Sequence, residues 1–98
     1  MSAGYEVASI IYRGVQAHLL RLLNQRAAIA CEIAAIKVAS GLPAYDGNRE
    51  RQVLARVIEK NTGPLDDQSV TDIFAGIIRE IRRLGTQRMQ EQQSAASK

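Results

Sequence analysis

The fold of this 98-residue chain is decided by the stretch from Leu19 to Glu50, which reads LLRLLNQRAAIACEIAAIKVASGLPAYDGNRE. Through its first half and back to Tyr12, apolar residues recur at alternating intervals of three and four. These positions, the heptad seam, include one arginine and are Tyr12, Val15, Leu19, Leu22, Arg26, Ile29, Ile33 and Ile36. Heptad spacing is typical of a helix packed lengthwise against other helices. It predicts one helix from about Tyr5 to Ser40, ended by Gly41 and Pro43.

Two cations lie on this predicted helix. Arg26 occupies a seam position, where a guanidinium is costly unless an anion or a polar network receives it. Lys37 follows eleven residues later, which places it within about 20° of the same face and roughly 16 Å along the axis. The space between the two side chains would suit a small dianion. From spacing alone two interpretations stay open: an anion site, or Arg26 paired with a core carboxylate while Lys37 reaches water.

The rest of the chain predicts two further helices. Asp46 is a plausible N-cap for a second helix that continues to about Asn61, and Thr62-Gly63-Pro64 is a strong break. A third helix follows, with apolar residues at helical spacing from Val70 to Leu84. We therefore expect an all-α domain of three helices with a very long first helix over residues 1–91, and a disordered polar tail over residues 92–98.

Composition limits the function classes. The chain is 46% hydrophobic and only 4% aromatic, with a net charge of +3, which permits anionic partners without demanding them. Cys31 is the only cysteine, so an intrachain disulfide and a cysteine-based metal site are excluded. There is no apolar run of membrane-spanning length and no secretory signal pattern, so we expect a cytoplasmic protein without membrane contact. The basic end of the third helix lacks interleaved aromatics and does not indicate nucleic-acid binding.

The predicted first helix also implies an assembly. It would be about 50 Å long, and its apolar seam needs partners along its whole length. The two shorter helices of one chain can cover only part of it. A homodimer with paired long helices is the economical solution.

The order of polar residues in this frame resembles a known family. Between about Leu19 and Ile78 the chain is similar to the all-helical AroQ-type chorismate mutases, on the motifs Leu-Leu-Asn-Gln-Arg26, Glu32-Ile33, Lys37, Gly41-Leu-Pro43, Tyr45-Asp46, Arg49-Glu50, Val53-Leu54, Asn61-x-Gly63-Pro64-Leu65 and Ile73-Phe74-x-x-Ile77-Ile78. That family folds as an intertwined three-helix homodimer with two active sites. It converts chorismate to prephenate, at the branch point toward phenylalanine and tyrosine, by a Claisen rearrangement that requires no metal or cofactor. The chemistry is selection of a compact conformer of a flexible dianion and stabilisation of charge on the ether oxygen.

The resemblance implies roles for five residues. Arg26 would bind a substrate carboxylate, and Lys37 would donate to the ether oxygen and a nearby carboxylate. Glu50 would accept from the substrate hydroxyl, Asp46 would contribute at the same end, and Arg49 lies beside them. Without the resemblance, Asp46 reads as a plain helix cap and Glu50 as a solvated first-turn acid.

Three departures from the family fall on the same site. Where the family usually carries an arginine on the first helix, then a small polar residue and a Gln or Glu on the third, this chain has Ser9, Ile81 and Gly85. Arg13, one helical turn after Ser9, is a candidate substitute for the arginine. Loss of one donor to the ether oxygen costs about 3–4 kcal/mol of transition-state stabilisation in comparable sites.

Two function classes therefore stay open. The first is a chorismate mutase, weakened by these departures or completed by a partner. The second is a binding or regulatory module of the shikimate pathway that keeps a pocket for chorismate or prephenate and works with a pathway enzyme. Isochorismate pyruvate lyase shares the family fold and is a further enzymatic alternative.

Overall fold

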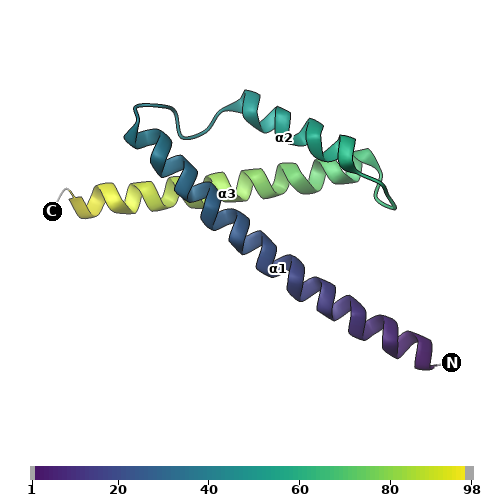
Figure 1. The fold of residues 1–98 in the computed structure, drawn as a ribbon. Helices are drawn as coiled ribbons and strands as arrows, with labels where there is room; N and C mark the ends of the chain where they lie inside the picture. Colours follow the sequence, from purple (N-terminus) through teal and green to yellow (C-terminus); the bar gives the residue numbers. More distant parts are fainter. Residues whose placement is uncertain (1, 97–98) are drawn as a thin grey trace. The chain divides into compact units, whose positions relative to one another are not determined.

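The computed structural model describes residues 2–96, and the described part of the chain contains three helices and no strand (Figure 1). Helix α1 runs over Ser2–Ala39, α2 over Gly47–Lys60 and α3 over Asp67–Ala96. The predicted all-α architecture with a very long first helix is confirmed. Helix α1 begins at Ser2, earlier than the expected start at Tyr5.

The end of α1 is fixed by a glycine turn. Gly41 has a φ of 78°, in the left-handed region that glycine adopts without a Cβ clash. The N–H of Leu42 donates to the carbonyl of Lys37 at 2.8 Å, and the N–H of Gly41 donates to the carbonyl of Val38 at 3.0 Å. This pair of bonds is a Schellman motif. The predicted helix end at Gly41 is confirmed, and the motif holds Lys37 in the last turn of α1.

Side-chain caps set the limits of α2. Asp46 is the N-cap, and one of its carboxylate oxygens accepts a hydrogen bond from the N–H of Asn48 at 2.9 Å. At the other end Asn61 is the C-cap, and its amide nitrogen donates to the carbonyl of Leu65 at 2.7 Å. Its amide oxygen accepts from the N–H of Gly63 at 3.1 Å. Asn61 therefore organises the turn that was predicted as a break between the second and third helices.

The start of α3 is capped in the same way. A carboxylate oxygen of Asp66 accepts a hydrogen bond from the N–H of Ser69 at 2.7 Å. Hydrogen bonds from the backbone and the side chain of Ser69 lower the pKa of Asp66 below its ordinary value. The folded chain therefore favours the ionised form of Asp66, which also suits the positive end of the helix dipole.

Helices α2 and α3 run antiparallel, side by side (Figure 1). Their facing stripes are apolar, and Val70 near the start of α3 is buried. The other members of the stripes are half-buried: Leu54, Val57 and Ile58 on α2, and Phe74, Ile77, Ile78, Ile81 and Leu84 on α3. Ile73, which belongs to the apolar pattern predicted from Val70 to Leu84, stays exposed. The packing of the two helices matters for function because it brings the first turn of α2 against the middle of α3.

The chain divides into two compact units, Met1–Glu32 and Ile33–Lys98. The first unit consists of most of α1. Its seam residues are largely exposed in the single chain: Tyr12, Val15, Leu19, Leu22 and Ile29. Among residues 2–96, none of the helices is both long and apolar enough to cross a membrane.

The C-terminal end of α3 extends beyond the predicted domain boundary. We expected a disordered tail over residues 92–98, but the helix continues to Ala96. Residues 97–98 of that tail lie outside the described residues. The sequence here is rich in glutamine and alanine, both good helix formers. The domain boundary at residue 91 stays a prediction.

Candidate functional site

Glu50 is held by an arginine from the neighbouring helix. It lies in the first turn of α2, where its backbone N–H donates to the carbonyl of the N-cap Asp46 at 3.1 Å. Its side-chain atom Oε1 lies 2.6 Å from Nη2 of Arg82 on α3. The two side chains are 28% and 45% exposed, respectively, so this Glu50–Arg82 pair is partly withdrawn from water. A short contact between opposite charges in such surroundings is stronger and better oriented than a fully solvated ion pair.

Tyr45 gives Arg82 a second contact. The guanidinium carbon of Arg82 lies 5.2 Å from the centroid of the half-buried Tyr45 ring. This distance is within the range of a cation–π interaction. Tyr45 belongs to the segment that leads into α2 and directly precedes the N-cap Asp46. Arg82 is thus bound by one residue from that segment and one from α2.

Asp46 and Arg49 lie beside this pair in sequence. Asp46 is exposed and acts as the N-cap, so the cap interpretation of this residue is confirmed; a role toward a ligand stays a prediction. Arg49 is exposed on α2 next to Glu50. The interpretation of Glu50 as a solvated acid does not hold, because Arg82 binds its carboxylate.

The two predicted cations of the first helix lie in different units. Lys37 belongs to Ile33–Lys98 together with Asp46, Arg49 and Glu50, and its half-buried side chain lies in the last turn of α1. Arg26 belongs to Met1–Glu32 and is also half-buried. Glu50 therefore contacts α3 within the second unit, whereas Arg26 belongs to the first unit.

The positions that depart from the family are also divided between the two units. Ser9 and Arg13 lie on α1 in the first unit, where Ser9 is half-buried and Arg13 exposed. Ile81 and Gly85 lie on α3 in the second unit, and Gly85 is buried. Neither Ile81 nor Gly85 carries a side chain that can donate a hydrogen bond. Among the described residues, no three His, Cys, Asp or Glu side chains are grouped so that they could hold a metal ion.

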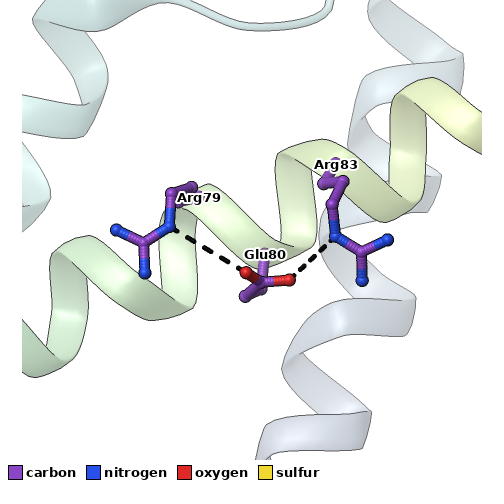
Figure 2. Close-up of polar contacts among 3 residues, drawn as sticks. All are labelled: Arg79, Glu80 and Arg83. Atoms are coloured by element: carbon purple, nitrogen blue, oxygen red, sulfur yellow. Dashed lines mark hydrogen bonds and ion pairs between the residues drawn. The ribbon is translucent and has the colours of Figure 1, made fainter.

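A second charged cluster on α3 lies outside this site. Figure 2 shows Glu80 between two arginines of its own helix, with Oε2 at 2.9 Å from Nε of Arg83 and Oε1 at 3.9 Å from Nε of Arg79. The hydrogen bond from Arg83 lowers the pKa of Glu80, and the charges of Arg83 and Arg79 act in the same direction. All three side chains are exposed. This cluster is a surface ion-pair network, whereas Arg82 reaches across to α2.

Sequence reasoning found Glu50 but not its partner. Arg82 was only one of several arginines near the end of the third predicted helix, and Tyr45 only one member of a motif. No local pattern distinguishes Arg82 from Arg79 or Arg83. The distinguishing fact is which arginine faces the start of α2 when the two helices pack.

The described part of the chain is an all-α protein of three helices. Glu50 of α2 and Arg82 of α3 form a polar site at the start of its second helix. The sequence model of the chorismate mutase type II family matches residues 14–86. The chain belongs to this family, and the resemblance noted in the sequence is confirmed.

Curated relatives and solved structures agree with this assignment. A bifunctional chorismate mutase/prephenate dehydratase from Neisseria gonorrhoeae is 39% identical over 66 residues, which cover 67% of this chain and 18% of the relative. The protein of the same description from Stutzerimonas stutzeri is 37% identical over 65 residues, with coverage of 61% and 18%. The chain thus spans about a fifth of the length of these relatives.

Among solved structures, Form II of the chorismate mutase from Thermus thermophilus superposes with a TM-score of 0.80 at 29% identity, covering 84% of this chain and 93% of that one. Form I of the same enzyme gives a TM-score of 0.76 at 30% identity, with coverage of 79% and 96%. The described fold therefore corresponds to nearly the whole length of these chains.

Proposed function

We propose that this chain is a chorismate mutase, an intramolecular isomerase that rearranges chorismate to prephenate in phenylalanine and tyrosine biosynthesis. The observation that carries the proposal is the family match over residues 14–86, which contains all five predicted site residues. The two superposed structures are both named as chorismate mutases and support it further.

The charge of each of these residues indicates which group of the substrate it contacts. Arg26 binds a carboxylate of the dianionic substrate, and Lys37 donates to the ether oxygen, where negative charge grows as the bond breaks. Glu50 accepts from the substrate hydroxyl, and Asp46 and Arg49 line the same end. Together these contacts select the compact conformer in which the two reacting ends meet. The rearrangement forms and breaks bonds within one molecule, so the site supplies positioning and electrostatic stabilisation and no cofactor.

We further propose that the active form is a homodimer in which the long helices of two copies pair. The heptad seam supports this proposal because its apolar residues remain exposed in the single chain, for example Val15 at 61% and Ile29 at 56%. Exposed apolar stripes of this length are typical of interaction surfaces. A second copy presents the same stripe and satisfies both at once. For such a dimer we propose a cytoplasmic location.

A second function is favoured by the missing donors on α3. Gly85 and Ile81 offer no hydrogen bond where the resemblance leads us to expect one, which lowers transition-state stabilisation more than ligand binding. The alternative is a module that binds chorismate or prephenate and acts with another enzyme of the shikimate pathway. The curated relatives, which are named as bifunctional proteins, support the idea of such a partner.

One pair of measurements separates these functions. Purified chain is incubated with chorismate while its disappearance is followed, and affinity for a bicyclic dicarboxylate analogue of the transition state is measured by calorimetry. Turnover together with tight analogue binding supports the enzyme. Binding without turnover supports the module, and the absence of both contradicts the proposed site.

A further inference from the structure

We propose that Arg82 is a positioning residue for Glu50, and that it sets the orientation in which Glu50 receives the substrate hydroxyl. This inference rests on the proposed function, in which Glu50 is the hydroxyl acceptor. It assigns a role to a residue of α3 that belongs to neither the predicted site nor its departures.

The first argument is geometric. Nη2 of Arg82 lies 2.6 Å from Oε1 of Glu50, and the guanidinium carbon lies 5.2 Å from the centroid of the Tyr45 ring. The guanidinium is planar and presents its donors in a fixed fork, so contacts on two sides restrict its orientation. Glu50 alone is a flexible side chain at the start of a helix. Bound to Arg82, its carboxylate is held toward α3.

The second argument concerns what the carboxylate can still do. A carboxylate has two oxygens and about four lone-pair sites. A bond from Arg82 to Oε1 leaves Oε2 of Glu50 able to accept the hydroxyl hydrogen of a substrate. The pair and the substrate contact therefore do not compete for the same atom.

The third argument is electrostatic. The proposed substrate carries two negative charges, and an unpaired carboxylate beside it would repel it. Arg82 offsets the charge of Glu50 while leaving its acceptor oxygen in place. This is why a carboxylate at the hydroxyl end is compatible with binding of a dianion.

The fourth argument is that neighbouring arginines do not duplicate this role. Arg79 and Arg83 contact Glu80 of their own helix, as Figure 2 shows, and both are more than half exposed. Arg83 is therefore a matched control, because it has the same residue type on the same helix, one position away, and is also paired with a glutamate.

The experiment uses Arg82→Gln, Arg82→Lys and the control Arg83→Gln in the full chain. We expect Arg82→Gln to lower kcat/KM by about 10- to 100-fold, since loss of alignment at a reacting centre has effects of this size. Arg82→Lys, which keeps the charge but not the planar fork, should recover part of the loss. Arg83→Gln should leave kcat/KM within about twofold of the parent, as expected for an exposed pair. Thermal melting of all variants checks that the helices are intact.

A double-mutant cycle separates positioning from direct contact. Affinity for a hydroxyl-bearing bicyclic dicarboxylate is measured for the parent, Arg82→Gln, Glu50→Ala and the double variant. If Arg82 acts through Glu50, its replacement has no further effect once Glu50 is gone. An equal effect in both backgrounds, or an Arg82→Gln effect no larger than that of Arg83→Gln, overturns the proposal.

A readout without substrate keeps this inference distinct from the proposed function. The carboxyl ¹³C resonance of Glu50 should move in Arg82→Gln and stay in place in Arg83→Gln, which should instead move the resonance of Glu80. If the parent does not rearrange chorismate but the Glu50 resonance moves as expected, the proposed function fails while the Glu50–Arg82 pair stands. If that resonance does not respond to Arg82→Gln, the pair itself is refuted.

Discussion

Leu19 tests the proposed pairing of the long helices. It lies on the heptad seam of α1 and is 54% exposed in the single chain. Full burial of a leucine side chain contributes about 1.5–3 kcal/mol, so covering the exposed half contributes roughly 1 kcal/mol in each copy. A two-fold dimer repeats the contact, which gives about 2 kcal/mol per dimer. Leu19→Ala should therefore raise the dissociation constant of the dimer about 30-fold.

The assay is sedimentation equilibrium or light scattering over a dilution series, with circular dichroism to confirm that the helix content is kept. Alanine is a better helix former than leucine, so a lost association cannot be attributed to a broken helix. Leu20→Ala is the matched control, because Leu20 is 61% exposed but lies off the heptad seam. A parent that is monomeric at micromolar concentration, or equal dissociation constants for the parent and Leu19→Ala, would refute the reasoning.

Three further predictions concern the site and the helix caps. Arg26→Ala or Lys37→Ala should abolish turnover and analogue binding without unfolding the chain, since alanine is a good helix former; unchanged affinity in both variants, measured by calorimetry, contradicts the assignment. The double variant Ser9→Arg, Gly85→Gln should rearrange chorismate about 100-fold faster if each restored contact contributes about 1.4 kcal/mol, and tenfold faster if only one of them does. Because Gly85 is buried, the larger glutamine side chain should overpack its surroundings and lower the melting temperature of the variant. Equal rates for the parent, the two single variants and the double variant would refute the alignment of Ser9 and Gly85 with the family's arginine and its Gln or Glu. Hydrogen bonds in the first turn of α3 lower the pKa of Asp66 below its ordinary 3.8, so its stabilising effect is present above pH 3.8 and is lost as the pH falls through the lowered value. Asp66→Asn keeps a capping oxygen but does not titrate, so the melting temperature of this variant should fall less steeply at acid pH than that of the parent. An equally steep fall in the variant contradicts the prediction.

Much of the fold could be predicted because it depends on local chemistry. Gly41 ends α1 since the left-handed turn needs a residue without a Cβ, and Asp46 begins α2 because its carboxylate satisfies a free N–H. Heptad spacing likewise predicted the long first helix. The turn and the cap act over a few residues and do not depend on how the helices pack, whereas the heptad spacing is a repeated pattern that is visible in the sequence itself.

The features that sequence reasoning missed depend on packing or on a balance of weak effects. The contact of Arg82 with Glu50 follows from the way α2 and α3 pack, and three neighbouring arginines looked alike before that was known. Helix α3 continues over residues 92–96 because the helix propensity of glutamine and alanine there outweighs the polarity that predicted a tail. The roles of Arg26 and Lys37 toward a ligand stay predictions, since they rest on the spacing of the two cations and on the resemblance.

The central claim is that this chain rearranges chorismate, and proton NMR of the reaction mixture tests it most directly. Purified parent protein and Lys37→Ala are incubated with chorismate in the presence of a chelator, and the resonances of substrate and product are followed over time. The account predicts that the parent forms prephenate faster than the uncatalysed reaction without any added metal or cofactor, and that Lys37→Ala abolishes the acceleration. Prephenate formation at the uncatalysed rate with the parent, or an equal rate with Lys37→Ala, would contradict it.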